Sequence, residues 1–148
     1  MNPSLIIFTL YLFLAIYCAG SMTVLQLQHF ALYPFVGKAI FKEYIKANNK
    51  AAILPAILPA ILLLLTTIIL LFFRPSFMSL LEVIISLFMN LVNIIATAIW
   101  QGRIHAQLEE IGYDESLINK LITTNWIRTS ALLVQSLTAI YSIFSTLH

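Results

Sequence analysis

Charged residues are scarce in this sequence. Asp, Glu, Lys and Arg make up only 9% of its 148 residues, whereas hydrophobic residues make up 61%. A soluble domain carries about a quarter charged residues, so this chain cannot cover a water-facing surface with charge. The composition therefore predicts an integral membrane protein, and the length fits one membrane domain over residues 1–148 rather than two domains.

Cysteine is almost absent, and the common catalytic motifs are missing. The lone Cys18 cannot form an internal disulfide and no Cys-x-x-Cys pair exists, which excludes the disulfide-exchange membrane enzymes. The sequence contains no recognisable phosphate-binding loop, Ser-His-Asp set or catalytic carboxylate pair. The net charge of +2 comes from Lys and Arg gathered in particular loops and does not indicate nucleic-acid binding.

Four apolar segments are long enough to cross a bilayer, whose hydrocarbon core needs about twenty residues of helix. No Lys or Arg precedes the first segment, so we expect it to remain as a helix rather than to be removed as a signal peptide. The predicted fold is all-α, a bundle of four transmembrane helices. The predicted spans are residues 5–27, 53–73, 77–100 and 121–147.

The basic residues predict the orientation of these helices. Cytoplasmic loops of membrane proteins are enriched in Lys and Arg. Only Arg74 falls between the second and third spans. We therefore expect both termini outside and both longer loops in the cytoplasm, in a multi-pass protein of the cell inner membrane. The other basic residues lie in or beside those two loops: Lys38, Lys42, Lys46, Lys50, Arg103, Lys120 and Arg128.

The first cytoplasmic loop has its own pattern. Between Lys38 and Lys50 the lysines recur every four residues, and aromatic and aliphatic residues fill the other faces. This pattern predicts a short amphipathic helix in the headgroup layer, with its lysines toward anionic membrane lipid. A solvated basic linker is the alternative. In the second loop, Asp114 can cap a short helix through Lys120.

A single polar seam runs along the third span. Its members recur at steps of three or four, so in a helix they share one face while the other faces are apolar. Such a helix requires lipid on its apolar faces and protein or a wet cavity against its seam. The seam consists of Glu82, Ser86, Asn90, Asn93, Thr97, Gln101 and His105.

The predicted topology brings polar residues from three helices to the cytoplasmic side. They either bridge helices as structural hydrogen bonds or line a pocket. In a pocket, Arg128 would bind an anionic oxygen, His29 or His105 would exchange a proton, and Trp126, Tyr33 and Tyr44 would offer flat surfaces. The catalytic candidates are His29, His105 and Arg128, and the ligand-binding candidates are Gln28, Asn90, Asn93, Gln101, Asn125 and Trp126.

The sequence identifies no cofactor. His29 and His105 are weak candidates for haem or copper ligation, because two histidines on different helices without His-x-x-His spacing are poor evidence for a metal site. We therefore predict no metal site.

Three stretches of this chain, residues 26–44, 105–108 and 121–129, resemble the anthrone-oxygenase-like family of small four-helix bacterial membrane proteins, which is largely of unknown function. The run Asn-Trp-Ile-Arg-Thr at 125–129 is the most specific part. The resemblance implies a four-helix bundle and oxidation of a flat phenolic or quinone-like substrate without an obvious cofactor. Matching positions are Gln28, His29, Asn125, Trp126 and Arg128.

This chain also departs from that family's pattern. Relatives often carry further histidines just after the position of Tyr44, where this chain has Ile45 and Asn48. A tryptophan and an arginine expected further along the last helix are replaced by Leu132 and Gln135. These departures argue against a histidine-rich metal site.

Three functions are compatible with the sequence. The first is binding or oxidation of a hydrophobic aromatic, quinone-like small molecule in the cytoplasmic-side pocket. The second is a non-catalytic accessory subunit of a larger membrane complex, whose partner would dock on the seam. The third is a small transporter or channel acting as a homo-oligomer. Enzymatic activity stays open at this point.

Overall fold

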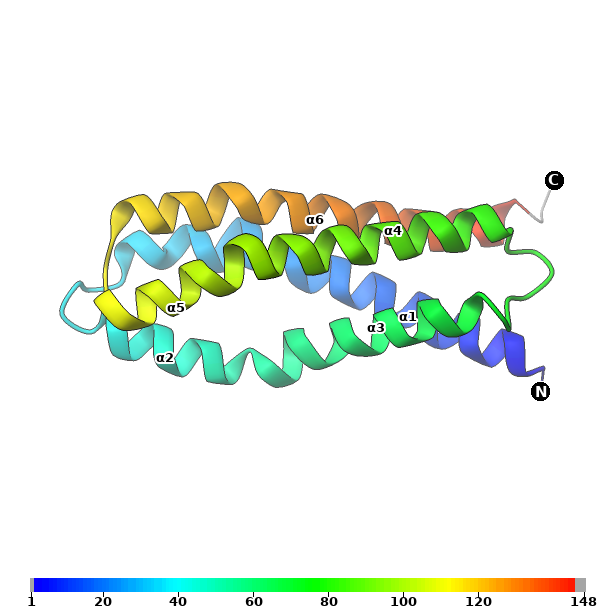
Figure 1. Cartoon of the computed structure of the whole chain (residues 1–148), viewed down its shortest axis with the longest axis horizontal. Helices are drawn as coiled ribbons and strands as arrows, with labels where there is room; N and C mark the ends of the chain where they lie inside the picture. The colour runs from blue at the N-terminus through cyan, green and yellow to red at the C-terminus, as the bar shows by residue number, and fades with distance from the viewer. Residues whose placement is uncertain (1, 146–148) are drawn as a thin grey trace.

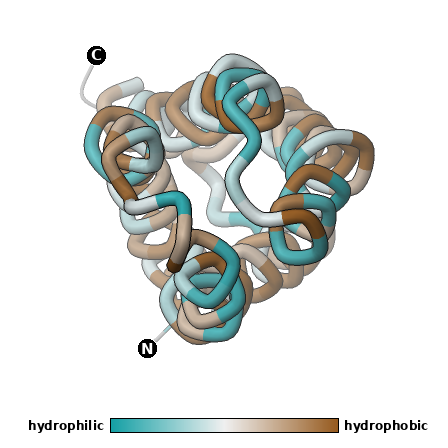
Figure 2. The backbone as a smooth tube through the Cα atoms, turned by 90° about the vertical axis from the view of Figure 1, so that its left-hand side faces the viewer, coloured by the Kyte–Doolittle hydropathy of each residue, from teal (hydrophilic) through white to brown (hydrophobic). Residues whose placement is uncertain are grey.

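A computed structural model describes residues 2–145, and within them four helical segments are long and apolar enough to cross a membrane. They run over Pro3–Phe35, Ile53–Leu70, Leu80–Ile111 and Glu115–Phe144. Figure 2 shows them end-on as four helical columns around one axis. The elements are α1 (Pro3–Val24), the π-helix η1 (Leu25–His29), the 3₁₀-helix η2 (Phe30–Phe35), α2 (Phe41–Ala51), the π-helix η3 (Ile53–Ile57), α3 (Leu58–Leu70), α4 (Leu80–Ala96), the π-helix η4 (Thr97–Gln101), α5 (Gly102–Ile111) and α6 (Glu115–Phe144).

The prediction of four spanning helices agrees with the structure, but three of the helices are longer than predicted. The first continues to Phe35 and the third to Ile111, and the fourth begins at Glu115. The predicted end of the fourth span at 147 lies outside the described residues. A helix of 33 residues is about 50 Å long, whereas the hydrocarbon core is about 30 Å thick. The bundle therefore projects beyond the apolar layer.

Helix caps explain two of the observed boundaries. The third span begins at Leu80 rather than 77 because Ser79 Oγ accepts from Glu82 N at 3.2 Å and Glu82 Oε2 accepts from Ser79 N at 2.6 Å, a capping box. Glu82, which the sequence pattern placed in the seam, is therefore a cap residue. Asp114 Oδ1 accepts from Leu117 N at 2.8 Å, as predicted, but the helix it caps is the whole of α6.

The turn between α5 and α6 requires a glycine. Gly112 has a φ of 89°, a conformation that side-chain-bearing residues rarely adopt, and its N–H donates to Leu108 O at 3.0 Å. This tight turn lets α6 run back antiparallel to α5.

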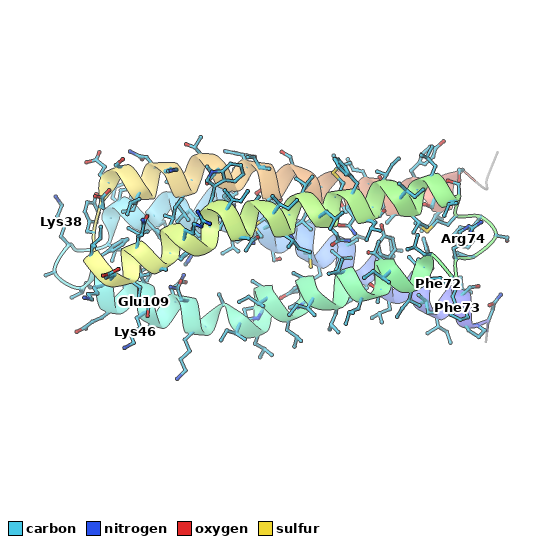
Figure 3. The ribbon with its side chains drawn as sticks, viewed as in Figure 1. Lys38, Lys46, Phe72, Phe73, Arg74 and Glu109 are labelled. Atoms are coloured by element: carbon cyan, nitrogen blue, oxygen red, sulfur yellow. The ribbon has the colours of Figure 1, made fainter. Side chains whose placement is uncertain are left out.

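We call the projecting end of the bundle, which comprises α2, α5 and the start of α6, the cap. It has its own hydrophobic core, the cap core. It joins α2 to α5 and to the start of α6, and α2 runs along the bundle axis as an extension of α3 (Figure 1). Lys38, Lys46 and Glu109 lie at this end, and Arg74 lies at the other (Figure 3). The cap core consists of Phe30, Tyr33, Phe41, Ile45, Ile104, Leu108, Ile118 and Leu121.

The polar seam of the third span faces the inside of the bundle, as its spacing predicts. Five of its members are buried, with exposed fractions of 8% for Glu82, 0% for Ser86, 2% for Asn90, 6% for Asn93 and 2% for Gln101. Apolar residues of the same helix, such as Phe88, are exposed on the outer surface, where lipid would lie.

Candidate ligand-binding site

Three π-helical segments surround a cavity of about 260 Å³ where the four spans pass into the cap. The segments η1, η3 and η4 come from the first, second and third spans, and each contributes lining residues. Single π-helical turns inside α-helices are rare and occur frequently at functional sites. The polar residues of the lining are His29, Asn48, Asn49, Thr97, Gln101, His105 and Arg128.

Among residues 2–145, Arg128 is the only charged side chain that lines the cavity, and it lacks a counter-charge. Its Nε donates to Asn93 Oδ1 at 3.2 Å and its Nη1 donates to Asn125 Oδ1 at 3.1 Å. Within the part of the chain that the structure describes, no carboxylate lies within 4.0 Å of the guanidinium. A cation in a membrane interior normally pairs with an anion or faces a water-filled cavity. The unbalanced charge of Arg128 therefore favours an anionic or carbonyl oxygen in the cavity.

Two buried polar atoms on the cavity wall have no hydrogen-bond partner among residues 2–145. They are Gln101 Oε1 and His105 Nδ1. The orientation of the Gln101 amide is set on its other side, because Nε2 donates to Leu121 O at 3.2 Å and to Thr124 Oγ1 at 3.0 Å. A buried polar atom without a partner costs about 1–3 kcal/mol. Neither atom is exposed to the cavity in this structure, so a ligand hydroxyl would remove that cost only if the side chain turned toward the cavity.

His29 is held by a small network that reaches α2. Its Nε2 lies 2.9 Å from Asn48 Oδ1, and Asn48 Nδ2 donates to the Tyr33 hydroxyl at 3.0 Å. Because the amide oxygen of Asn48 can only accept, this contact assigns the proton of a neutral His29 to Nε2. The cavity wall is thereby tied to the cap.

The ring surfaces beside the cavity differ from the predicted ones. Phe30 lies between the two histidines, with ring centroids 5.7 Å from His29 and 6.0 Å from His105. Tyr33 belongs to the cap core, and Tyr44 packs against it. Partial burial raises the pKa of Tyr44 above its usual value, so its phenol stays neutral at physiological pH.

The cavity continues into a second hollow of about 310 Å³ between α3 and α4, which we call the trough. Asn90 and Asn93 border the trough, and Arg128 stands at the junction of the two hollows. The rest of the trough is formed by apolar residues and Thr97.

Deeper in the bundle, polar residues bridge the helices. Tyr11 and Ser86 hydroxyls lie 2.6 Å apart, and Thr67 Oγ1 accepts from Asn90 Nδ2 at 3.0 Å and from Gln135 Nε2 at 3.3 Å. This network joins all four spans. The bonding of Asn90 therefore fits the structural interpretation of the seam better than a binding role.

The structure brings four of the predicted site residues together. His29, Gln101, His105 and Arg128 line one cavity although they come from three spans. In the described residues, no group of three or more His, Cys, Asp or Glu side chains is placed to hold a metal ion.

The other five predicted site residues do not line the cavity, and two of them, Asn90 and Asn93, border the trough instead. Asn125 is fully buried behind Arg128, and its Nδ2 donates to Gln26 Oε1 at 2.8 Å. Gln28 is exposed, and Trp126 is 47% exposed on the opposite surface of α6. Four-residue spacing from the buried Cys18 and Met22 places Gln26, not Gln28, on the inner face of the first span.

The sequence reasoning also missed three residues of these networks. In the sequence, Asn48 and Gln135 stand out only as departures from the family's pattern, and no motif marks Thr67. The available signal is that Thr66 and Thr67 are the only hydroxyl-bearing residues in a long apolar span. Because an unpaired polar group in lipid costs several kcal/mol, such hydroxyls are expected to form hydrogen bonds inside the protein.

No protein-family model, curated protein or solved structure matches this chain. The resemblance to the anthrone-oxygenase-like family therefore stays a prediction.

Proposed function

We propose that the cavity binds a hydrophobic small molecule whose head is a flat oxygenated ring, of the phenol or quinone type. The observation that carries this proposal is the set of unsatisfied groups on one wall: the uncompensated Arg128 guanidinium and the unpartnered Gln101 Oε1 and His105 Nδ1. In a protein without a ligand, these groups would cost stability.

The proposed head matches the donors and acceptors of the wall. Arg128 donates to a carbonyl or ionised hydroxyl oxygen, and Gln101 Oε1 accepts from a ligand hydroxyl. The His105 imidazole is placed to exchange a proton with a bound phenol. A hydroxylated quinone satisfies all of these groups with one ring system.

The dimensions of the cavity favour a small flat head. Drug-sized ligands occupy pockets of roughly 300–1,000 Å³, whereas this cavity holds about 260 Å³. Phe30 and the two histidines supply ring surfaces against which an aromatic head packs with favourable edge or offset contacts.

The proposal predicts saturable binding of a simple hydroxynaphthoquinone to the purified protein in detergent micelles. The His105→Leu variant should bind about tenfold more weakly, because one hydrogen bond is worth about 1 kcal/mol or somewhat more. Isothermal titration calorimetry measures both affinities.

Gln107→Leu is the matched control, since Gln107 is exposed on the same helix outside the cavity. It should bind as the unaltered protein does. Binding that is absent from the unaltered protein, or equal in all three proteins, would refute a site at His105.

We further infer that the cap faces the cytoplasm of a cell whose inner membrane holds the bundle. Support comes from the basic residues, which gather at the cap end and exceed the single Arg74 at the other. Because α2 runs along the bundle axis, its lysines would meet anionic headgroups from an upright helix rather than from one lying flat.

Cysteine labelling tests this orientation. Lys38→Cys and Arg74→Cys replace exposed residues at opposite ends, in a background where the buried Cys18 is changed to alanine. In intact cells, a membrane-impermeant maleimide should label only the Arg74→Cys protein. Labelling of Lys38→Cys instead would reverse the topology.

A further inference from the structure

The cavity and the trough adjoin one another along α3 and α4. Four residues line both hollows: Ala56, Ile57, Thr97 and Arg128. From Asn90 at one end to His105 at the other, the helix rises by about 22 Å at about 1.5 Å per residue. A ring-shaped head alone would leave most of this length empty.

The trough opens sideways toward the position of the lipid. Ile57, Ile61 and Ile94 border it with exposed fractions of 50%, 51% and 42%. Ala60 of α3 and Ala98 of η4 also line it. Their methyl side chains leave room between the two helices, which run side by side in Figure 1.

From the cavity to the trough, the lining becomes more apolar, as a membrane lipid does from its head to its tail. A core of about 30 Å accommodates about twenty helical residues, which places the hydrocarbon of the third span between Leu80 and about residue 100. The cavity around Gln101 and His105 therefore lies at the headgroup boundary, whereas the trough lies in the hydrocarbon. A molecule with a polar head and an apolar tail matches this gradient in its normal bilayer orientation.

We propose that the ligand is an amphiphile, an oxygenated aromatic head carrying an aliphatic tail, that enters from the bilayer between α3 and α4. The head occupies the cavity and contacts Arg128, and the tail lies in the trough between Ala60 and Ala98. The aromatic nature of the head rests on the proposed function. The tail and the lateral entry rest on the trough itself.

The test compares two probes, the hydroxynaphthoquinone and the same head with a decyl tail, in the unaltered protein and in Ala98→Phe. Affinities are corrected for partition of each probe into the micelles. The tail should raise the affinity of the unaltered protein at least about tenfold, since a buried methylene contributes about 0.8 kcal/mol and several become buried. In Ala98→Phe this gain should disappear while the affinity for the tail-less head stays unchanged.

Two further variants secure the interpretation. Ala60→Phe fills the trough from the facing helix and replaces Ala98→Phe if that protein does not fold. Ser130→Phe adds the same ring to an exposed position of α6, outside the cavity and the trough, and should keep the gain from the tail.

The outcomes separate the two proposals. Equal affinities for both probes in the unaltered protein, or a gain that survives in both trough variants, would overturn the trough proposal and leave the proposed head site standing. If neither probe binds, both proposals fail. Stoichiometric displacement of the tailed probe by phosphatidylglycerol would support the trough and the Arg128 contact, but it would assign the head to a lipid phosphate rather than to an aromatic ring.

Discussion

Replacing Arg128 by leucine should weaken binding of the hydroxynaphthoquinone about 100-fold and should also make the protein more stable. Hydrogen bonds to charged groups contribute about 1.5–3 kcal/mol, and each 1.4 kcal/mol is a factor of about ten in affinity. Arg128 is the only charged group on the cavity wall, so no neighbour replaces its contact with the ligand oxygen. Titration calorimetry on the purified variant gives the change in affinity.

The expected gain in stability follows from comparing two opposing effects. A charged residue at the centre of a membrane helix costs about 2.5–3.5 kcal/mol on insertion scales, and Arg128, which lies nearer the headgroup boundary, costs less. Leucine loses the two hydrogen bonds from Arg128 to Asn93 and Asn125, and such bonds in membrane proteins average about 0.6 kcal/mol each. The removed charge outweighs the lost bonds, so the free energy of unfolding should rise by about 1 kcal/mol. Unfolding by sodium dodecyl sulfate in mixed micelles measures it.

Arg103 provides the matched control. It is an exposed arginine on α5 outside the cavity, so Arg103→Leu should change neither affinity nor stability by more than experimental error. Arg128→Lys should bind with intermediate affinity, because lysine keeps the charge but not the planar donor pattern. A loss of stability in Arg128→Leu together with unchanged binding would assign Arg128 to the scaffold instead of the site.

The spanning helices and the inward seam could be predicted because the bilayer interior holds no water to bond with polar groups. Where no water competes, apolar length identifies a spanning segment and polar periodicity identifies its inner face. The burial of Asn90, Asn93 and Gln101 follows directly from that spacing. The helix extensions into the cap were not predicted. High hydropathy identifies the part of a helix that lies in lipid, but it does not show whether the helix continues beyond the lipid.

The candidate site was predictable in its members but not in its detail. Equal depth in three helices was enough to group His29, Gln101, His105 and Arg128. Depth alone does not say which residues point inward: Gln28, a position matched by the family resemblance, is exposed, whereas Gln26 is buried.

The position of Trp126 could not be predicted either. Trp126 lies on the face of α6 opposite to Asn125 and Arg128, and its neighbours there are apolar apart from Ser130. A tryptophan next to polar residues in the sequence is therefore not necessarily next to them in space. Only the rotation of α6 in the bundle decides which of them face the cavity.

Replacing Asn125 by leucine should have the opposite effect on stability from the change at Arg128. Asn125 is fully buried and makes the link between the first and fourth spans, with Nδ2 2.8 Å from Gln26 Oε1 and Oδ1 3.1 Å from Arg128 Nη1. Leucine is close to asparagine in size, so the change removes the polar contacts without leaving a large cavity. The free energy of unfolding should fall by about 1 kcal/mol, since the bonds to Gln26 and from Arg128 are both lost at about 0.6 kcal/mol each.

A double-mutant cycle separates this link from the general effect of leucine. Gln26→Leu together with Asn125→Leu should cost less than the sum of the two single changes, because replacing both partners leaves no unpaired amide. Asn119→Leu, at an exposed position of the same helix, should leave stability unchanged. Additive effects in the cycle would show that the two amides do not stabilise one another.

The two substitutions together distinguish a site from a scaffold. Asn125 stands behind Arg128, away from the cavity wall, so its loss should lower stability and weaken binding only by letting the guanidinium move. Arg128 faces the cavity, so its loss should raise stability and remove binding. A residue retained for folding alone would not destabilise the fold. If the loss of Arg128 raises stability while the loss of its neighbour Asn125 lowers it, the protein keeps the unbalanced charge of Arg128 for a ligand.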